Sequence, residues 1–201
     1  MPTYKLTYFK HWGRGGVLRL LFAADGIEFE DVRIEREQWP ELKPKTPMGQ
    51  IPILEVDGTM ICQRRAIGRL IAKEAGLAGK TPLEEARADM IVDGLADLEG
   101  KIVDFFIEQD EKRKQEKIKE FAEKTLPTFL VTYEKLASSG GHFVGNALTW
   151  ADVDFFAMMF FLKDHLPSDP LQGYVNLNKV RDNVSSHPGI AGWLEKEGAS
   201  Q

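Results

Sequence analysis

The apolar and polar positions of the first 76 residues change period several times. Residues 4–9 alternate between two faces, as in a strand, and residues 14–24 carry apolar side chains at helical spacing until Asp25-Gly26 ends the pattern. A second strand is expected at 29–34. It should run parallel to the first, because a crossover through a helix is almost always right-handed.

A hairpin that leads into a helix is predicted between residues 48 and 75. Two short apolar runs, 51–56 and 59–62, flank an Asp57-Gly58 turn of type I′, and helical spacing follows. Pro52 has no N–H for a strand ladder, so the first run is expected to be an edge strand or to be entered through a strained or cis turn. The preceding residues, 35–47, contain three prolines and are expected to form a loop with short helical turns.

The hairpin region also suggests a ligand. An edge strand beside Pro52 would leave the backbone of Ile51 able to pair with an extended peptide. Gln63 and Arg64 stand where a strand becomes a helix, so backbone N–H groups at the helix N-terminus would face an anion there. Together these features indicate a small anionic peptide.

The rest of the chain has only helical patterns. Thr81-Pro82-Leu83-Glu84 is a strong helix start, and Thr149 with Asp152 forms a second capping pair before a segment that is apolar on almost every side. Such a segment belongs in the centre of a helical bundle. The expected helices are 82–109, 112–137 with a possible kink at Pro127, 149–165, 174–185 and 188–197.

The expected fold is therefore a thioredoxin-like α/β domain followed by an all-helical domain. The boundaries are 1–76 for the first domain, 77–80 for a linker and 81–201 for the second. The first domain has the thioredoxin order of elements without the Cys-x-x-Cys motif.

Composition excludes several classes of function. A net charge of −5 gives no reason to expect nucleic acid or an anionic membrane as a partner, and no apolar run approaches the length of a membrane span. The single cysteine, Cys62, fits a reducing compartment, so a cytoplasmic protein is expected. The four histidines lack the spacing of metal ligands, so no metal is expected: His11, His142, His165 and His187.

Motifs along nearly the whole chain carry a family resemblance. In order, they are Leu6-Thr7-Tyr8-Phe9, Arg14, Trp39-Pro40, Lys43, Thr46-Pro47, Gly49-Gln50-Ile51-Pro52-Ile53-Leu54, Gln63 with Ala66-Ile67, Leu77-Ala78-Gly79-Lys80-Thr81 and Thr149-Trp150-Ala151-Asp152. The chain resembles the glutathione transferases, and the sigma class in particular. That resemblance implies a cytoplasmic, homodimeric detoxification enzyme that takes glutathione as co-substrate and joins its thiolate to a small hydrophobic electrophile.

The resemblance assigns two catalytic residues. Tyr8 matches the family's catalytic tyrosine, whose hydroxyl stabilises the thiolate, and Arg14 matches an arginine near it. A free cysteine thiol has a pKa near ~8.5, so such stabilisation is needed at neutral pH. Without the resemblance, Tyr8 would be read as a packed strand aromatic and Arg14 as a surface residue.

The same resemblance implies the binding residues. Trp39 and Lys43 would hold the glycine end of glutathione, the Ile51 backbone its cysteinyl unit, and Asp97 would reach the γ-glutamyl amine across a dimer interface. Taken alone, Trp39 could be a loop anchor, and Lys43 and Asp97 ordinary surface charges. The full glutathione set is Trp39, Lys43, Gln50, Ile51, Pro52, Gln63, Arg64 and Asp97. The expected hydrophobic substrate pocket comprises Phe9, Glu99, Val103, Phe156 and Met159.

The chain departs from the family pattern at several positions. Arg64 stands where a serine is usual, with Arg65 where an apolar residue is common, Trp12 replaces a common arginine, and Gly15-Gly16 replaces a small residue and a glutamate. Arg64 would either contact the γ-glutamyl carboxylate or fill its site. These departures keep open a catalytically weak or inactive relative that binds ligands or serves as a structural protein, as the related lens crystallins do. A glutathione-dependent prostaglandin isomerase is a minor alternative, since Asp104 replaces the tryptophan found in the synthase.

Overall fold

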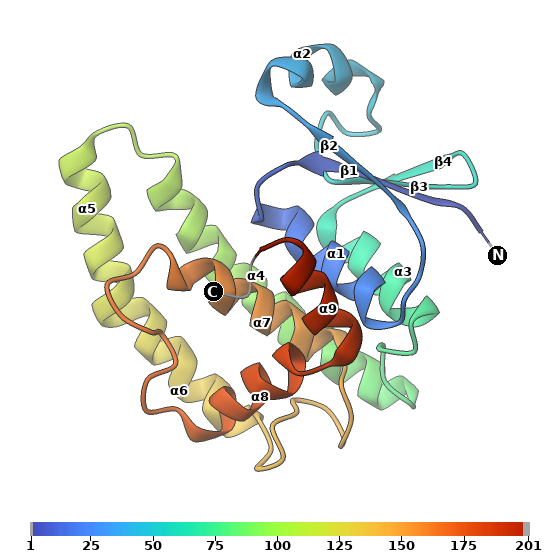
Figure 1. The fold of residues 1–201 in the computed structure, drawn as a ribbon. Coiled ribbons are helices and arrows are strands. Elements are labelled where there is room, and N and C mark those ends of the chain that lie inside the picture. The colour runs from blue at the N-terminus through green and yellow to red at the C-terminus, as the bar shows by residue number, and fades with distance from the viewer. Residues whose placement is uncertain (1, 199–201) are drawn as a thin grey trace. The chain divides into compact units, whose positions relative to one another are not determined.

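The computed structural model describes residues 2–198, which form two compact units. The first contains residues 2–78 together with 186–198, and the second contains residues 79–185. Figure 1 shows the helices and strands of both units, coloured from the N-terminus to the C-terminus. The expected combination of a thioredoxin-like α/β part and a helical part is confirmed.

A four-stranded sheet forms the centre of the first unit. Its order is β2-β1-β3-β4, with β2 parallel to β1, as expected, and the other two pairings antiparallel. The strands are β1 (Tyr4–Phe9), β2 (Glu30–Ile34), β3 (Ile53–Val56) and β4 (Thr59–Cys62).

Of the two alternatives expected at Pro52, the edge strand does not occur, because β3 lies between β1 and β4. Pro52 precedes the first ladder residue, Ile53, so the sheet requires no N–H from it. The Ile51–Pro52 peptide bond is cis, which is the other form of entry that the sequence allowed. The Asp57-Gly58 turn has positive φ at both residues, 47° and 84°, as a type I′ turn requires.

Helices cover the sheet of the first unit. The helices α1 (Gly13–Ala24) and α3 (Arg64–Glu74) contact each other and the strands, and both lie on the same side of the sheet in Figure 1. Between β2 and β3 the chain forms only short turns of helix, as the three prolines predicted. These are η1 (Arg36–Gln38), α2 (Trp39–Leu42) and η2 (Lys43–Lys45).

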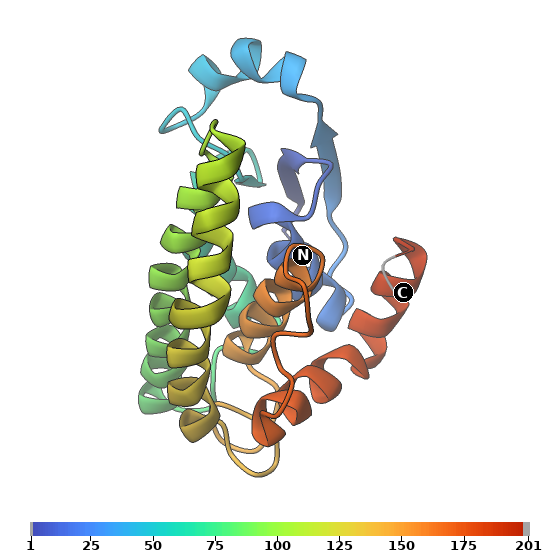
Figure 2. The ribbon, with the colours of Figure 1, turned by 90° about the vertical axis from the view of Figure 1, so that its left-hand side faces the viewer.

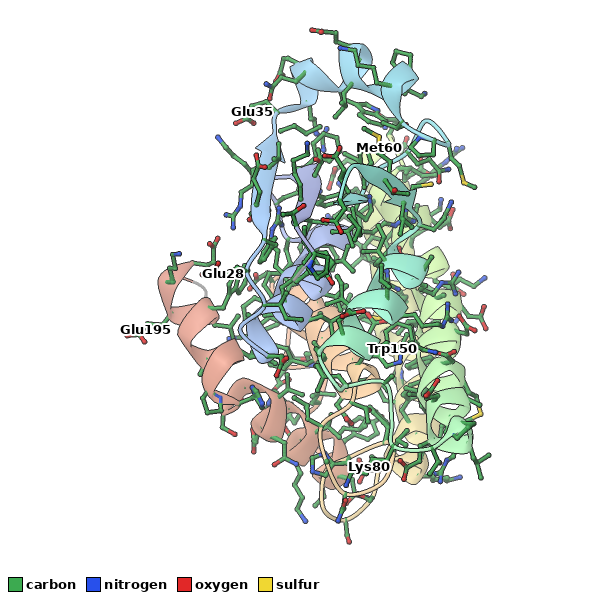
Figure 3. The ribbon with its side chains drawn as sticks, turned by 90° about the vertical axis from the view of Figure 1, so that its right-hand side faces the viewer. Glu28, Glu35, Met60, Lys80, Trp150 and Glu195 are labelled. Atoms are coloured by element: carbon green, nitrogen blue, oxygen red, sulfur yellow. The ribbon has the colours of Figure 1, made fainter. Side chains whose placement is uncertain are left out.

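The last helix, α9 (Pro188–Lys196), belongs to the first unit, although the sequence placed it with the helical domain. It packs against α1, and a Cβ on Gly189 would lie 2.0 Å from the carbonyl oxygen of Ala23. Only a glycine permits that approach. The polar end of α9, with Glu195, is labelled in Figure 3.

All regular secondary structure of the second unit is helical. Figure 2 shows α4, in green, and the yellow stretch from α5 to α6 running lengthwise alongside each other. Its helices are α4 (Pro82–Phe106), α5 (Glu111–Glu120), the π-helical turn η3 (Phe121–Thr125), α6 (Leu126–Leu136), α7 (Trp150–Lys163) and α8 (Val175–Ser185).

Two details differ from the expected helices. The expected helix 82–109 ends at Phe106, and the expected kink at Pro127 is a π-helical turn over Phe121–Thr125. Proline has no N–H for the carbonyl four residues earlier, and widening the preceding turn accommodates that loss.

Both expected helix caps are present. Thr81 Oγ1 accepts from the Glu84 N–H at 3.2 Å, while the Glu84 carboxylate accepts from the Lys80 N–H at 2.7 Å. Thr149 and Asp152 form a reciprocal capping box. The helix that follows is buried from Trp150, labelled in Figure 3 and 2% exposed, through Met159, which confirms its central place.

Within residues 2–198, no helix has both the length and the apolar character needed to cross a membrane.

Candidate active site

Tyr8 lies near the end of β1, close to the first turn of α1. It is 6% exposed, and its hydroxyl oxygen accepts a hydrogen bond from the backbone N–H of Arg14 at 3.1 Å. The first N–H groups of a helix lack intrahelical acceptors and carry partial positive charge. The phenol oxygen therefore stands at a point where negative charge on a neighbouring atom is favoured.

Two glycines give the Tyr8 side chain its space. A Cβ on Gly15 would lie 2.5 Å from Tyr8 Cδ1, and one on Gly13, whose φ is +35°, would lie 2.7 Å from the hydroxyl oxygen. Both contacts are shorter than real side chains allow. Gly15, which the sequence marked only as a departure from the family pattern, thus leaves the space that the Tyr8 ring occupies.

Trp12 and Gly16 form a second close pair. A Cβ on Gly16 would lie 2.7 Å from the Trp12 indole, whose ring also meets Trp193 of α9 edge-on at 5.9 Å. The tryptophan at position 12 and the glycine at position 16 therefore fit each other as a packing pair. The pair attaches the loop before α1 to the last helix.

Aromatic rings surround the end of β1. The His11 ring stacks on Phe9 at 5.3 Å and meets Tyr8 edge-on at 5.5 Å, and Trp39 approaches Phe9 at 6.5 Å. Burial and the charge of Arg36, followed by that of Arg19, lower the pKa of His11. Sequence reasoning gave His11 no role and missed its place beside Tyr8.

An ion-pair network joins β1, β2, α1 and Glu197 within the first unit. Arg19, only 2% exposed, donates from Nε to the Asp31 carboxylate at 3.0 Å and from Nη2 to the Phe9 carbonyl at 3.2 Å. Asp31 also accepts from Arg33, which pairs with both carboxylate oxygens of Glu197 at 2.6 and 2.9 Å. The hydrogen bonds to Glu197 raise the pKa of Arg33, and burial lowers that of Arg19.

Sequence reasoning missed this network as well. An arginine within the apolar run of 17–22 was its only signal. The partners of Arg19, which are Asp31 and the Phe9 carbonyl, lie 12 and 10 residues away along the chain. The network holds the carbonyl group of Phe9, the residue after Tyr8.

The residues expected to bind the γ-glutamyl end gather at the start of α3. Gln63 precedes the helix with φ of 77°, and its amide donates to Gln50 Oε1 at 2.9 Å. Arg64, the first helical residue, is 9% exposed, so its side chain packs against the protein instead of extending into solvent. The side chain of Gln63, the N-cap residue, makes no capping hydrogen bond to α3.

The residues expected at the glycine end lie on the turns between β2 and β3. Trp39, half-buried, begins α2, and exposed Lys43 begins η2. The Lys43 stem passes 3.5 Å from the position of a Cβ on Gly49. Ile51 is half-buried and Pro52 buried.

In the helical unit, the expected residues divide between two helices in contact. Asp97 is exposed on α4, with Glu99 and Val103 half-buried on the same helix. Phe156 and Met159 on α7 are 4% and 3% exposed, as core residues would be. Sequence reasoning did not identify a ring cluster formed by Phe106, Phe161 and His165, with centroid distances of 5.3, 5.0 and 4.4 Å.

Among residues 2–198, no group of three or more His, Cys, Asp and Glu side chains is placed to hold a metal ion.

Comparison with known families identifies both parts of the chain. Residues 4–73 match the glutathione S-transferase N-terminal domain, and residues 96–197 match the glutathione S-transferase C-terminal domain. The chain belongs to the glutathione S-transferase family. The resemblance of the sequence motifs to the glutathione transferases is confirmed.

Transferases and prostaglandin synthases are both found among the relatives of this glutathione transferase. The chain is 42% identical to Glutathione S-transferase 1 of Ascaris suum, over 96% of each chain. It is 39% identical to Hematopoietic prostaglandin D synthase of Gallus gallus, over 98% of this chain and 97% of the relative. The solved structure of prostaglandin synthase D of Nilaparvata lugens superposes with a TM-score of 0.90 at 37% identity, covering 97% and 98% of the two chains.

Membership of this family makes the chain an enzyme of the glutathione transferase type, for which glutathione is a substrate. Such an enzyme must favour the thiolate over the thiol of its substrate. Tyr8, at the end of a strand and beside a helix N-terminus, has the chemistry and surroundings for that task.

Proposed function

We propose that this protein is a sigma-class glutathione transferase in which Tyr8 stabilises the thiolate of bound glutathione for attack on a hydrophobic electrophile. The observation that carries the proposal is the bond from the Arg14 N–H to the Tyr8 hydroxyl oxygen. A phenol both accepts and donates, so this bond fixes the oxygen while its O–H serves as the donor to sulfur. The partial positive charge at the start of α1, together with Arg14, further favours the anion.

The binding proposal assigns each end of glutathione to a polar group. The γ-glutamyl carboxylate would accept from backbone N–H groups at the start of α3, beside Gln63, and Gln50 would orient that end. The glycine carboxylate would meet Lys43 and the Trp39 indole N–H. The cysteinyl unit would pair with the backbone of Ile51, before Pro52.

We propose that Arg64 leaves this site open. Its side chain is buried, and the carboxylate would be held by main-chain N–H groups that any residue type provides. Calorimetric titration of reduced glutathione at neutral pH tests this point. Binding in the micromolar to low-millimolar range is the expected result, and absence of heat and of thermal stabilisation at millimolar glutathione would favour the non-catalytic, crystallin-like alternative.

The catalytic assignment is tested by Tyr8→Phe. Loss of a hydrogen bond to an anion costs about 1.5–3 kcal/mol, so kcat/KM for conjugation should fall roughly 10- to 100-fold. Tyr4→Phe is the matched control. Tyr4 lies four residues before Tyr8 on the same face of β1, is 8% exposed, and its ring contacts Phe22. Equal activity of the Tyr8→Phe variant and the wild type would refute the role.

We further propose a cytoplasmic homodimer that detoxifies electrophiles, with Asp97 reaching the γ-glutamyl amine of glutathione bound to the partner. The exposure of Asp97 on α4 is compatible with that reach. The proposed contacts of the electrophile are Phe9, Glu99, Val103, Phe156 and Met159. Sedimentation velocity tests the dimer, and Asp97→Asn should weaken glutathione binding; a monomer with unchanged affinity in this variant would refute both.

The second candidate is a glutathione-dependent prostaglandin isomerase, favoured by the relatives that are named prostaglandin D synthases. Asp104, where the synthase has a tryptophan, is an exposed carboxylate paired with Lys117 at 3.4 Å. A charged pair is a poor surface for a fatty-acyl chain. Conversion of a prostaglandin endoperoxide, measured beside conjugation of a model electrophile, separates the two activities.

A further inference from the structure

His11 occupies the loop between β1 and α1, next to the proposed catalytic tyrosine. Its ring stacks on Phe9 with an interplanar angle of 21° and meets the Tyr8 ring edge-on at 5.5 Å. The residue as a whole is exposed, although Phe9 and Tyr8 cover part of its ring, while Tyr8 is buried. His11 is thus a partly exposed ring in contact with a buried tyrosine.

Gly13 sets an upper limit on the distance between the Tyr8 hydroxyl oxygen and His11 Nε2. A Cβ built on this residue would lie 2.7 Å from the Tyr8 hydroxyl oxygen and 3.0 Å from His11 Nε2. The separation of the oxygen and the nitrogen therefore cannot exceed the sum of these two distances. One sulfur atom can lie within hydrogen-bonding reach of both.

The charges around His11 favour its neutral form. Arg36 on η1 and Arg19 on α1 are the cations acting on it, and both, after burial, lower its pKa. Its partners on β1, Tyr8 and Phe9, carry no charge at neutral pH. A neutral imidazole has one nitrogen that accepts a proton.

We propose that His11 is the general base that takes the thiol proton of glutathione. The S–H bond breaks, its electron pair stays on sulfur, and the proton forms a bond to His11 Nε2. The Tyr8 hydroxyl donates to the resulting thiolate, and His11 keeps the proton, so that an imidazolium cation lies beside the thiolate and stabilises it. The assignment rests on the proposed transferase function and adds to it a second group at the sulfur.

The proposal predicts a specific dependence on pH. Protonated His11 cannot accept a second proton, so thiolate formation declines as pH falls through the pKa of His11. His11→Gln keeps a polar side chain that does not titrate, and His11→Phe keeps the ring that stacks on Phe9. Both variants should lower kcat/KM roughly 10- to 100-fold near neutral pH. This is at or below the lower limit of the effect expected for a general base, because Tyr8 still stabilises the anion.

The experiment measures the ultraviolet absorbance of enzyme-bound thiolate at saturating glutathione as a function of pH, together with glutathione affinity by calorimetry and thermal unfolding. The expected result is a higher apparent pKa of bound glutathione in both variants, with affinity within about threefold of wild type. His165→Gln, which changes another exposed, ring-stacked histidine, is the control and should leave the titration unchanged.

Each other outcome overturns the proposal in a distinguishable way. An unchanged thiolate titration in both variants would exclude proton acceptance by His11. Wild-type behaviour of His11→Phe with a shift only in His11→Gln would indicate a packing role. Absence of glutathione binding in the wild type would instead refute the proposed function itself.

Discussion

Asp152 should be among the most sensitive polar positions of the helical unit. Its carboxylate is fully buried, and it accepts from the Phe143 N–H at 2.8 Å and from the N–H and hydroxyl of Thr149 at 2.8 and 2.9 Å. These bonds join the loop before α7 to the first turn of the helix. We predict that Asp152→Ala strongly destabilises the protein.

The magnitude follows from the groups left behind. Two buried backbone N–H groups would lose their acceptor, at about 1–3 kcal/mol each. Removing the buried carboxylate recovers part of this, since burial disfavours its ionised form and raises its pKa. A loss of about 3 kcal/mol in the free energy of unfolding is expected, and Asp152→Asn, which retains an acceptor oxygen, should lose about half as much.

Urea unfolding followed by far-ultraviolet circular dichroism measures the effect. The control is Asp110→Ala, which removes an exposed N-cap whose carboxylate accepts one bond from the Arg113 N–H at 2.9 Å. An exposed cap contributes about 0.5–1 kcal/mol. If Asp152→Ala lost no more than Asp110→Ala, the argument from buried, unsatisfied N–H groups would be refuted.

Two further predictions concern the first unit. Gly15→Ala should destabilise the protein by about 1–3 kcal/mol and lower turnover, because the new Cβ would meet the Tyr8 ring. Its control, Gly100→Ala on α4, has open space around the new Cβ and should stabilise the protein by up to about 1 kcal/mol. Thermal unfolding and conjugation rates check both variants. Hydrogen bonds from Thr3 lower the pKa of Asp57 below its ordinary value of 3.8, so the stability it adds is present above that value and lost as pH falls through the lowered pKa. Asp57→Asn should therefore differ from wild type in unfolding titrations at neutral pH and match it in strong acid, and a constant difference across this range would contradict the reasoning.

Local chemistry predicted the elements whose causes are local. Strand β1 follows from six alternating residues, and the Asp57-Gly58 turn from the tolerance of these residues for positive φ. The capping box at Thr149 and Asp152 likewise depends on residues three apart. Such features require no knowledge of the rest of the fold.

Features that depend on distant residues were not predictable in the same way. The interior position of β3 depends on β1, more than 40 residues earlier, and burial of Arg19 depends on acceptors on two strands. The grouping of α9 with the first unit depends on Gly189 meeting the end of α1. No period or spacing in the sequence encodes these contacts.

The candidate site shows the same division. Motifs brought forward Tyr8, Arg14 and Gln63, whose roles stay proposals, but gave no sign of the ring contacts of His11 or the space that Gly15 leaves for the Tyr8 ring. Two departures from the family pattern, Trp12 and Gly16, make sense only as a pair in contact. A residue-by-residue comparison treats them as separate losses.

The first unit is built from both ends of the chain, and this has a consequence for its synthesis. While a ribosome is making the helical unit, the sheet and α1 are already outside the exit tunnel without α9, and Arg33 has not yet met Glu197. The nascent unit therefore waits for more than 100 intervening residues before its last helix arrives. A truncation before residue 188 would therefore remove the contact of α9 with α1 and the Arg33–Glu197 ion pair, and so destabilise a unit whose sheet lies more than 100 residues earlier in the chain.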